Sequence, residues 1–129
     1  MDMSITLLYA GMLAVLLLAL SWNVVRFRRR LRVGLGDGGH PELQRAIRVH
    51  GNFLEYAPLG LILLGLLEAD GLPAGWLHLA GASLVICRLL HAFGLSGSDG
   101  TSFGRFVGTL GTWIVLAALA VTAIARALI

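Results

Sequence analysis

The sequence has no lysine, a single cysteine and few charged residues of any kind. Charged residues make up 13% of the chain, about half the share found in soluble domains, so an ordinary soluble enzyme and a disordered protein both fit poorly. The lone Cys87 excludes an intramolecular disulfide and a cysteine-based metal site. The net charge is +3, but the arginines gather in one connection between apolar segments, as in membrane proteins. We therefore expect membrane lipid rather than nucleic acid as a partner.

Hydrophobic residues, by contrast, make up 57% of the 129 residues and fall into four long runs. A helix needs about 20 apolar residues to cross the hydrocarbon core of a bilayer. The runs predict helices at about 5–25, 41–68, 74–95 and 105–128. The first run is too long for a signal-peptide core and no small-residue cleavage site follows it, so we expect it to be retained. The sequence predicts an all-α, integral membrane four-helix bundle, with residues 1–129 as one domain.

The distribution of arginines predicts the orientation of this bundle. Seven of the ten arginines lie between Arg26 and Arg48, together with two acids, whereas the next connection has two acids and no arginine. Because arginine-rich connections stay in the cytoplasm, we expect the first and third connections there and both termini outside. Arg126 is the exception, and we expect its long side chain to snorkel from the helix end to the membrane surface.

Polar residues interrupt the second apolar run. Arg48, Asn52 and Glu55 are spaced i, i+4 and i+7, which places them on one helix face with Tyr56 beside it. An ionisable residue at this depth is costly unless it faces a bundle interior or a polar cavity. Glu55 therefore indicates a functional site. The simpler alternative is that Arg45 or Arg48 pairs with Glu55 only to hold helices together.

A second polar pair lies at the same depth near the end of the third run. Arg88 and His91 are spaced i, i+3 and share a face. A lone histidine more often packs than binds, but two polar clusters at one depth favour a shared site. Guanidinium groups with one asparagine and one carboxylate favour a small zwitterionic ligand that carries carboxylates and an amine. We expect no metal, because the arginines oppose a cation.

One motif of the second run, R-x-x-R-x-x-x-N-x-x-E-Y-x-P from Arg45 to Pro58, resembles the signature of the MAPEG family. These are membrane-associated proteins in eicosanoid and glutathione metabolism. The wider string RVHGNFLEYAPLGLILLGLLE is similar to the bacterial branch of the family. The resemblance covers essentially the whole chain, including the R-x-x-H of Arg88 and His91 and the Arg105 that opens the fourth run.

The resemblance implies a homotrimer in the bacterial inner membrane, with glutathione as co-substrate between neighbouring subunits in the cytoplasmic half. It implies transfer of glutathione to a lipophilic electrophile, or reduction of a hydroperoxide. Arg105 would stabilise the glutathione thiolate, and its role would be electrostatic because arginine cannot act as a base at neutral pH. The residues expected to bind glutathione are Arg26, Arg48, Asn52, Glu55, Tyr56, Arg88 and His91.

Assembly has one further signal in the sequence. Gly104, Gly108 and Thr112 repeat at four-residue spacing and form a small-residue stripe that allows close helix approach. The polar faces of the second and third helices also require cover from lipid. We expect association of subunits, whereas the number three comes from the family resemblance.

Other functions fit the residues less well. Leu95 stands where some eicosanoid-metabolising members carry a tyrosine, so leukotriene- or prostaglandin-type chemistry is not expected. One alternative is a catalytically inactive binding or structural protein of the same fold. Another is a small four-helix exporter, but such exporters use a glutamate in the first helix, and the run 5–25 has none. The strong arginine asymmetry also argues against the dual topology of exporters.

Overall fold

The computed structural model describes residues 2–96 and 102–129. These residues form four helices and no strand: α1 (Ser4–Leu31), α2 (Pro41–Ala69), α3 (Ala74–Ser96) and α4 (Phe103–Leu128). All four are long and apolar enough to cross a membrane, which confirms the predicted all-α membrane bundle. The middle of the third connection and the side chain of Leu95 lie outside the described part of the chain.

Two helix boundaries differ from the sequence prediction by more than one residue. α1 continues through the arginine cluster to Leu31, six residues beyond the predicted end, because arginine is a good helix former and positive charge suits a helix C-terminus. The helix stops at Arg32, which adopts a left-handed conformation with φ of 58°. α4 starts two residues early, because the hydroxyl of Ser102 caps it by accepting the N–H of Arg105 at 3.2 Å.

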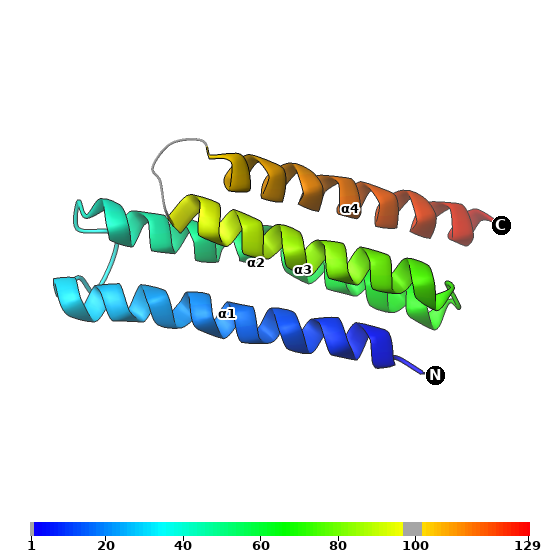
Figure 1. Cartoon of the computed structure of the whole chain (residues 1–129). Coiled ribbons are helices and arrows are strands. Elements are labelled where there is room, and N and C mark those ends of the chain that lie inside the picture. The colour runs from blue at the N-terminus through cyan, green and yellow to red at the C-terminus, as the bar shows by residue number, and fades with distance from the viewer. Residues whose placement is uncertain (1, 97–101) are drawn as a thin grey trace.

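The helices run antiparallel, with α2 and α3 between α1 on one side and α4 on the other (Figure 1). α1 and α4 make no contact with each other in the described chain. Both termini lie at one end of the bundle, and the α1–α2 connection, the end of α3 and the start of α4 lie at the other (Figure 1). We call these the terminal end and the loop end; the predicted site residues lie between the middle of the helices and the loop end.

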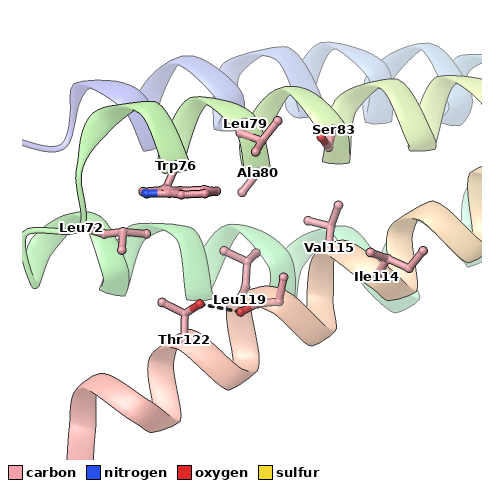
Figure 2. Close-up of a pocket in the computed structure, with 10 residues that line it drawn as sticks. Leu72, Trp76, Leu79, Ala80, Ser83, Ile114, Val115, Leu119 and Thr122 are labelled. Atoms are coloured by element: carbon pink, nitrogen blue, oxygen red, sulfur yellow. Dashed lines mark hydrogen bonds between the residues drawn. The ribbon is translucent and has the colours of Figure 1, made fainter. Parts of the chain in front are cut away.

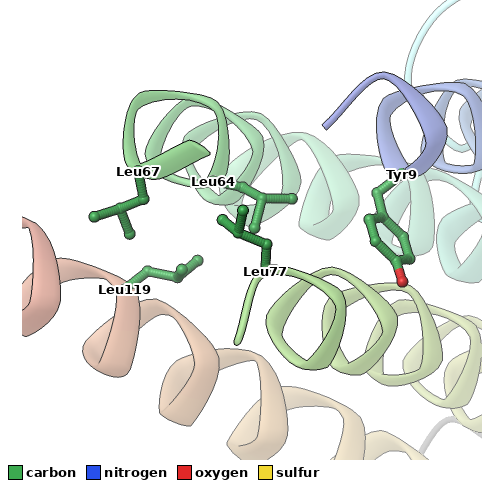
Figure 3. Close-up of a cluster of buried hydrophobic side chains, with 5 residues drawn as sticks. All are labelled: Tyr9, Leu64, Leu67, Leu77 and Leu119. Carbon is green, nitrogen blue, oxygen red and sulfur yellow. The ribbon is translucent and has the colours of Figure 1, made fainter. Parts of the chain in front are cut away.

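The terminal half is held by an apolar core and by two polar ties. Tyr9, Leu64, Leu67, Leu77 and Leu119 bring all four helices together (Figure 3). One tie joins α1 to α2, since the carboxylate of Glu68 accepts the backbone N–H groups of residues 5 and 6 at 2.9 and 2.7 Å. A carboxylate is favoured at this helix N-terminus, where free N–H groups and the positive end of the dipole meet.

The second tie involves Arg126 at the end of α4. Its guanidinium forms an ion pair with the carboxylate of Asp70 and also donates to the Asp70 carbonyl oxygen. The side chain thus reaches from α4 to the α2–α3 connection, where Asp70 is a partner that the sequence did not predict. The pair joins the end of α4 to the α2–α3 connection.

The small-residue stripe of α4 lies inside the protomer. A Cβ atom at Gly108 would come within 2.6 Å of the His91 backbone nitrogen and 2.7 Å of the Cys87 carbonyl oxygen. Thr112, on the next turn, is fully buried. The expectation that this stripe lies between subunits is therefore wrong: it packs α4 against α3 of the same chain. This contact sets the position of Arg105.

We predict that Gly108→Ala destabilises the protein by about 1–3 kcal/mol, because the added methyl group meets immobile backbone. The matched control is Gly11→Ala on α1, where an added Cβ meets nothing within 4 Å and the alanine gains up to about 1 kcal/mol of helix propensity. Thermal unfolding in a mild detergent compares the two. Equal melting temperatures for both variants would contradict the packing described for α3 and α4.

Candidate functional site

An ion pair is the outermost part of the polar cluster on α2. Nη1 of Arg48 lies 3.5 Å from Oε1 of Glu55, and both side chains are about half exposed, at 57% and 48%. The helical spacing read from the sequence therefore does place the two groups on one face. A half-exposed ion pair in water contributes little to stability. Inside a membrane span the same pair is costly unless protein or a polar ligand covers it.

Behind this pair, Arg88 of α3 is buried with 2% of its surface exposed. Its Nη1 donates to the side-chain oxygen of Asn52 at 2.6 Å and to the Asn52 carbonyl oxygen at 3.2 Å. The guanidinium carbon lies 5.8 Å from the centre of the Tyr56 ring, within the range of a cation–π contact. Nε and Nη2 of Arg88 find no hydrogen-bond partner among the described residues.

His91 lies one turn further along α3 and is also buried, at 4% exposure. Its backbone contacts Gly108, so the close approach of α3 and α4 puts the start of α4 beside it. The imidazole lies within electrostatic range of three arginines, which are Arg88, Arg105 and Arg48. Positive charge from three different helices thus converges around one histidine, an arrangement that attracts an anion and repels a metal cation.

A family comparison covers the part of the chain that holds this cluster. The model of the MAPEG family matches residues 6–125. The chain belongs to the MAPEG family. The match extends over all four helices.

Two curated relatives of this MAPEG chain carry the same description. Both are called inner membrane protein YecN, one from Escherichia coli strain K12 and one from Escherichia coli O6:H1. Each is 43% identical over 90 residues, which cover 70% of this chain and 69% of the relative. Their names give a membrane location and no activity.

One MAPEG-type residue predicted from the resemblance lies apart from the others. Arg26 is exposed on α1, donates to the side-chain oxygen of Asn23 at 2.8 Å and stacks on Phe27. It lines a separate cavity of about 330 Å³ between α1 and α3, next to Phe93. The other seven predicted residues come together in one protomer, as Arg48, Asn52, Glu55, Tyr56, Arg88, His91 and Arg105.

Sequence reasoning missed a larger cavity in the terminal half. It has a volume of about 520 Å³ and opens between α3 and α4, with Trp76, Leu79, Val115 and Leu119 among its lining residues (Figure 2). Its polar side chains are few, and one of them, Thr122, already donates to a backbone carbonyl oxygen of α4. The sequence offers only a weak signal for it, the small residues Ala80 and Ala118 on the two walls.

Proposed function

We propose that this protein is a glutathione-dependent transferase or peroxidase that acts on lipophilic electrophiles or hydroperoxides. The observation that carries the proposal is the half-exposed Arg48–Glu55 pair, backed by buried Arg88 and His91, within the membrane-spanning helices. Family membership makes glutathione chemistry a natural candidate. The arrangement of charges in this chain is a second, independent support for the proposal.

The charges of the site match a ligand that carries both signs. Guanidinium groups bind carboxylates through charge-assisted, often bidentate hydrogen bonds, and Arg48 exposes such a group. Glu55 offers a carboxylate for an ammonium group, seven residues along the same helix. Glutathione has two carboxylates and one ammonium group, so it can replace the internal Arg48–Glu55 contact with one partner for each side chain.

The position of Arg105 suits a role at the sulfur. It lies in the first turn of α4, within electrostatic range of His91. Positive side chains and helix N-termini both favour a thiolate over a thiol. Arg105 would therefore lower the pKa of the glutathione thiol and hold the anion for attack, without accepting a proton itself.

Assembly as a homotrimer, with glutathione between subunits, explains two features that one protomer leaves open. The polar face with Arg48 and Glu55 is half exposed at membrane depth and needs a protein neighbour to shield it from lipid. Arg26 lies outside the polar cluster of its own chain, so it can join such a site only on a neighbouring subunit. Native mass spectrometry in a mild detergent that shows monomers alone would contradict this assembly.

The apolar cavity between α3 and α4 lies in the terminal half, away from Arg105, so it supports entry of a lipophilic molecule from the bilayer and not the place of attack by the thiolate. Its lining is almost entirely hydrocarbon, and it lies between two helices that are long and apolar enough to cross the membrane. A molecule dissolved in the bilayer can enter such a cavity without crossing water. Conjugation and peroxide reduction both begin with attack by the same thiolate, so the cavity does not choose between them.

The location that we propose is the bacterial inner membrane, with the site toward the cytoplasm. The relatives are named as inner membrane proteins, and the loop end holds most of the arginines. A reporter fused after residue 129 should therefore read periplasmic and one inserted near Gly36 cytoplasmic, because arginine-rich connections remain inside. The reverse pattern would move the site to the periplasmic side and overturn this orientation.

We predict that Arg48→Ala and Glu55→Gln each weaken glutathione binding by about ten- to a hundredfold, the value of a charge-assisted contact. The matched controls are Arg30→Ala and Glu42→Gln, from an exposed ion pair of 3.6 Å outside the cluster. Isothermal titration of the detergent-solubilised protein gives the affinities. Equal losses of glutathione affinity in the two pairs of variants would show that the α2 face with Arg48 and Glu55 is not part of the binding site.

Arg105→Ala should behave differently, because its partner is the developing anion. We predict that glutathione still binds while the thiolate signal and turnover fall by about a hundredfold, as on loss of one preorganised stabilising group. Arg126→Ala, at the other end of α4, is the control. Thiolate is followed by its ultraviolet absorbance on mixing. Retention of both signals in Arg105→Ala would exclude Arg105 from the mechanism.

Turnover of a chlorinated nitroaromatic electrophile by the purified protein separates catalysis from binding. The proposal requires conjugate formation that depends on both glutathione and protein. Glutathione binding without turnover of this electrophile or of a lipid hydroperoxide would instead identify a binding protein of the same fold.

A further inference from the structure

We propose that Arg88 is a positioning residue, which fixes the direction of the Asn52 amide so that Asn52 offers its ligand only hydrogen-bond donors. The inference deepens the proposed function and takes glutathione from it as the ligand. The orientation itself follows from two side chains within one protomer.

The amide direction is decided by what arginine can do chemically. A guanidinium has five N–H donors, no acceptor and stays protonated in proteins. The short contact of 2.6 Å from Arg88 Nη1 to Asn52 must therefore end on the amide oxygen, since the reverse orientation would set two donors against each other. The NH₂ group of Asn52 then faces away from Arg88. A second bond, from the same Nη1 to the Asn52 carbonyl oxygen at 3.2 Å, ties the backbone at this point as well.

The cost of burying Arg88 argues that this contact does more than join two helices. Its side chain is buried, with Nε and Nη2 lacking hydrogen-bond partners among the described residues. A buried charge with unsatisfied donors is expensive, and well-packed apolar residues usually join helices at lower cost. At 2% exposure Arg88 also has almost no surface to offer a ligand. Its effect on the ligand therefore passes through Asn52.

A fixed Asn52 amide determines where the site offers hydrogen-bond donors and where it offers acceptors. Asn52 and Glu55 are three residues apart on α2, so their side chains are neighbours on one face. One presents N–H donors and the other, when ionised, only acceptor oxygens. A ligand that fits must bring an acceptor, such as a carboxylate or an amide carbonyl, to Asn52 and a donor to Glu55. A cation without an acceptor group can pair with Glu55 but leaves the N–H donors of Asn52 without a partner.

The first test is Asn52→Asp, which keeps the shape of the side chain and replaces the NH₂ group with an acceptor. The new carboxylate also pairs with buried Arg88, so we expect the melting temperature to stay equal or rise. Glutathione affinity should fall by about tenfold or more, because an acceptor now faces an acceptor. A variant that binds glutathione like the wild type, or one that loses most of its stability, would overturn the proposal.

The second test asks whether Arg88 acts through Asn52. Arg88→Lys keeps a pure donor and should retain affinity, whereas Arg88→Gln can both donate and accept, so it releases the amide and should weaken binding by about tenfold. In an Asn52→Ala background Arg88→Gln should have no further effect on affinity, because coupled residues are not additive. The same loss in both backgrounds would show that Arg88 acts independently of Asn52.

Failure of the proposed function gives a different result from failure of this inference. Wild-type protein that does not bind glutathione would refute the proposed ligand. The stability of Asn52→Asp, and the coupling of Arg88 and Asn52 measured by thermal unfolding, would still test the orientation. Absence of that coupling in a protein that binds glutathione would refute the inference alone.

Discussion

A buried arginine between two membrane-spanning helices is the constraint on which the loop-end half of this protein depends. Arg88 cannot give up its charge, and lipid cannot solvate it. The guanidinium group instead donates hydrogen bonds to two oxygens of Asn52 and lies over the ring of Tyr56, both residues of α2. These contacts bind α3 to α2 at the depth where Glu55 and Arg48 emerge on the surface. The polar face of α2 is thus the outer layer of a network whose inner layer is Arg88.

Different contacts hold the four helices together at the two ends of the bundle. At the terminal end, a core of leucines and one tyrosine is flanked by the contact of Glu68 with the N-terminus of α1 and by the Asp70–Arg126 pair. At the loop end, Gly108 allows α4 to pack closely against the backbone of α3. This close packing places Arg105 near His91. Small apolar clusters such as Val49 with Ala92 continue the core toward the loop end, where the buried polar side chains Arg88 and His91 also lie.

The sequence predicted the helices and the polar face because both depend on local periodicity. The spacing of Arg48, Asn52 and Glu55 is enough to place them together, and the R-x-x-H of α3 marks the depth at which they meet a second helix. Local patterns do not report which helix a stripe faces, so the glycines of α4 were assigned to an interface between subunits rather than to α3.

Contacts between residues far apart in the chain were beyond the reach of these patterns. The Arg126–Asp70 pair joins residues 56 positions apart, and no pattern in the sequence links them. Arg26 was grouped with the other ligand residues by resemblance alone, while its own protomer holds it on a different face. The apolar cavity depends on how α4 is placed against α3, which composition does not encode.

A structure of the protein determined in lipid nanodiscs with glutathione present tests the central claim most directly. The account predicts glutathione against Arg48, Asn52 and Glu55, at the loop end and between two subunits, with its sulfur toward Arg105 and Arg88 still buried against Asn52. Glutathione in any other place, or an α2 face that remains covered by lipid with no ligand bound, would contradict it.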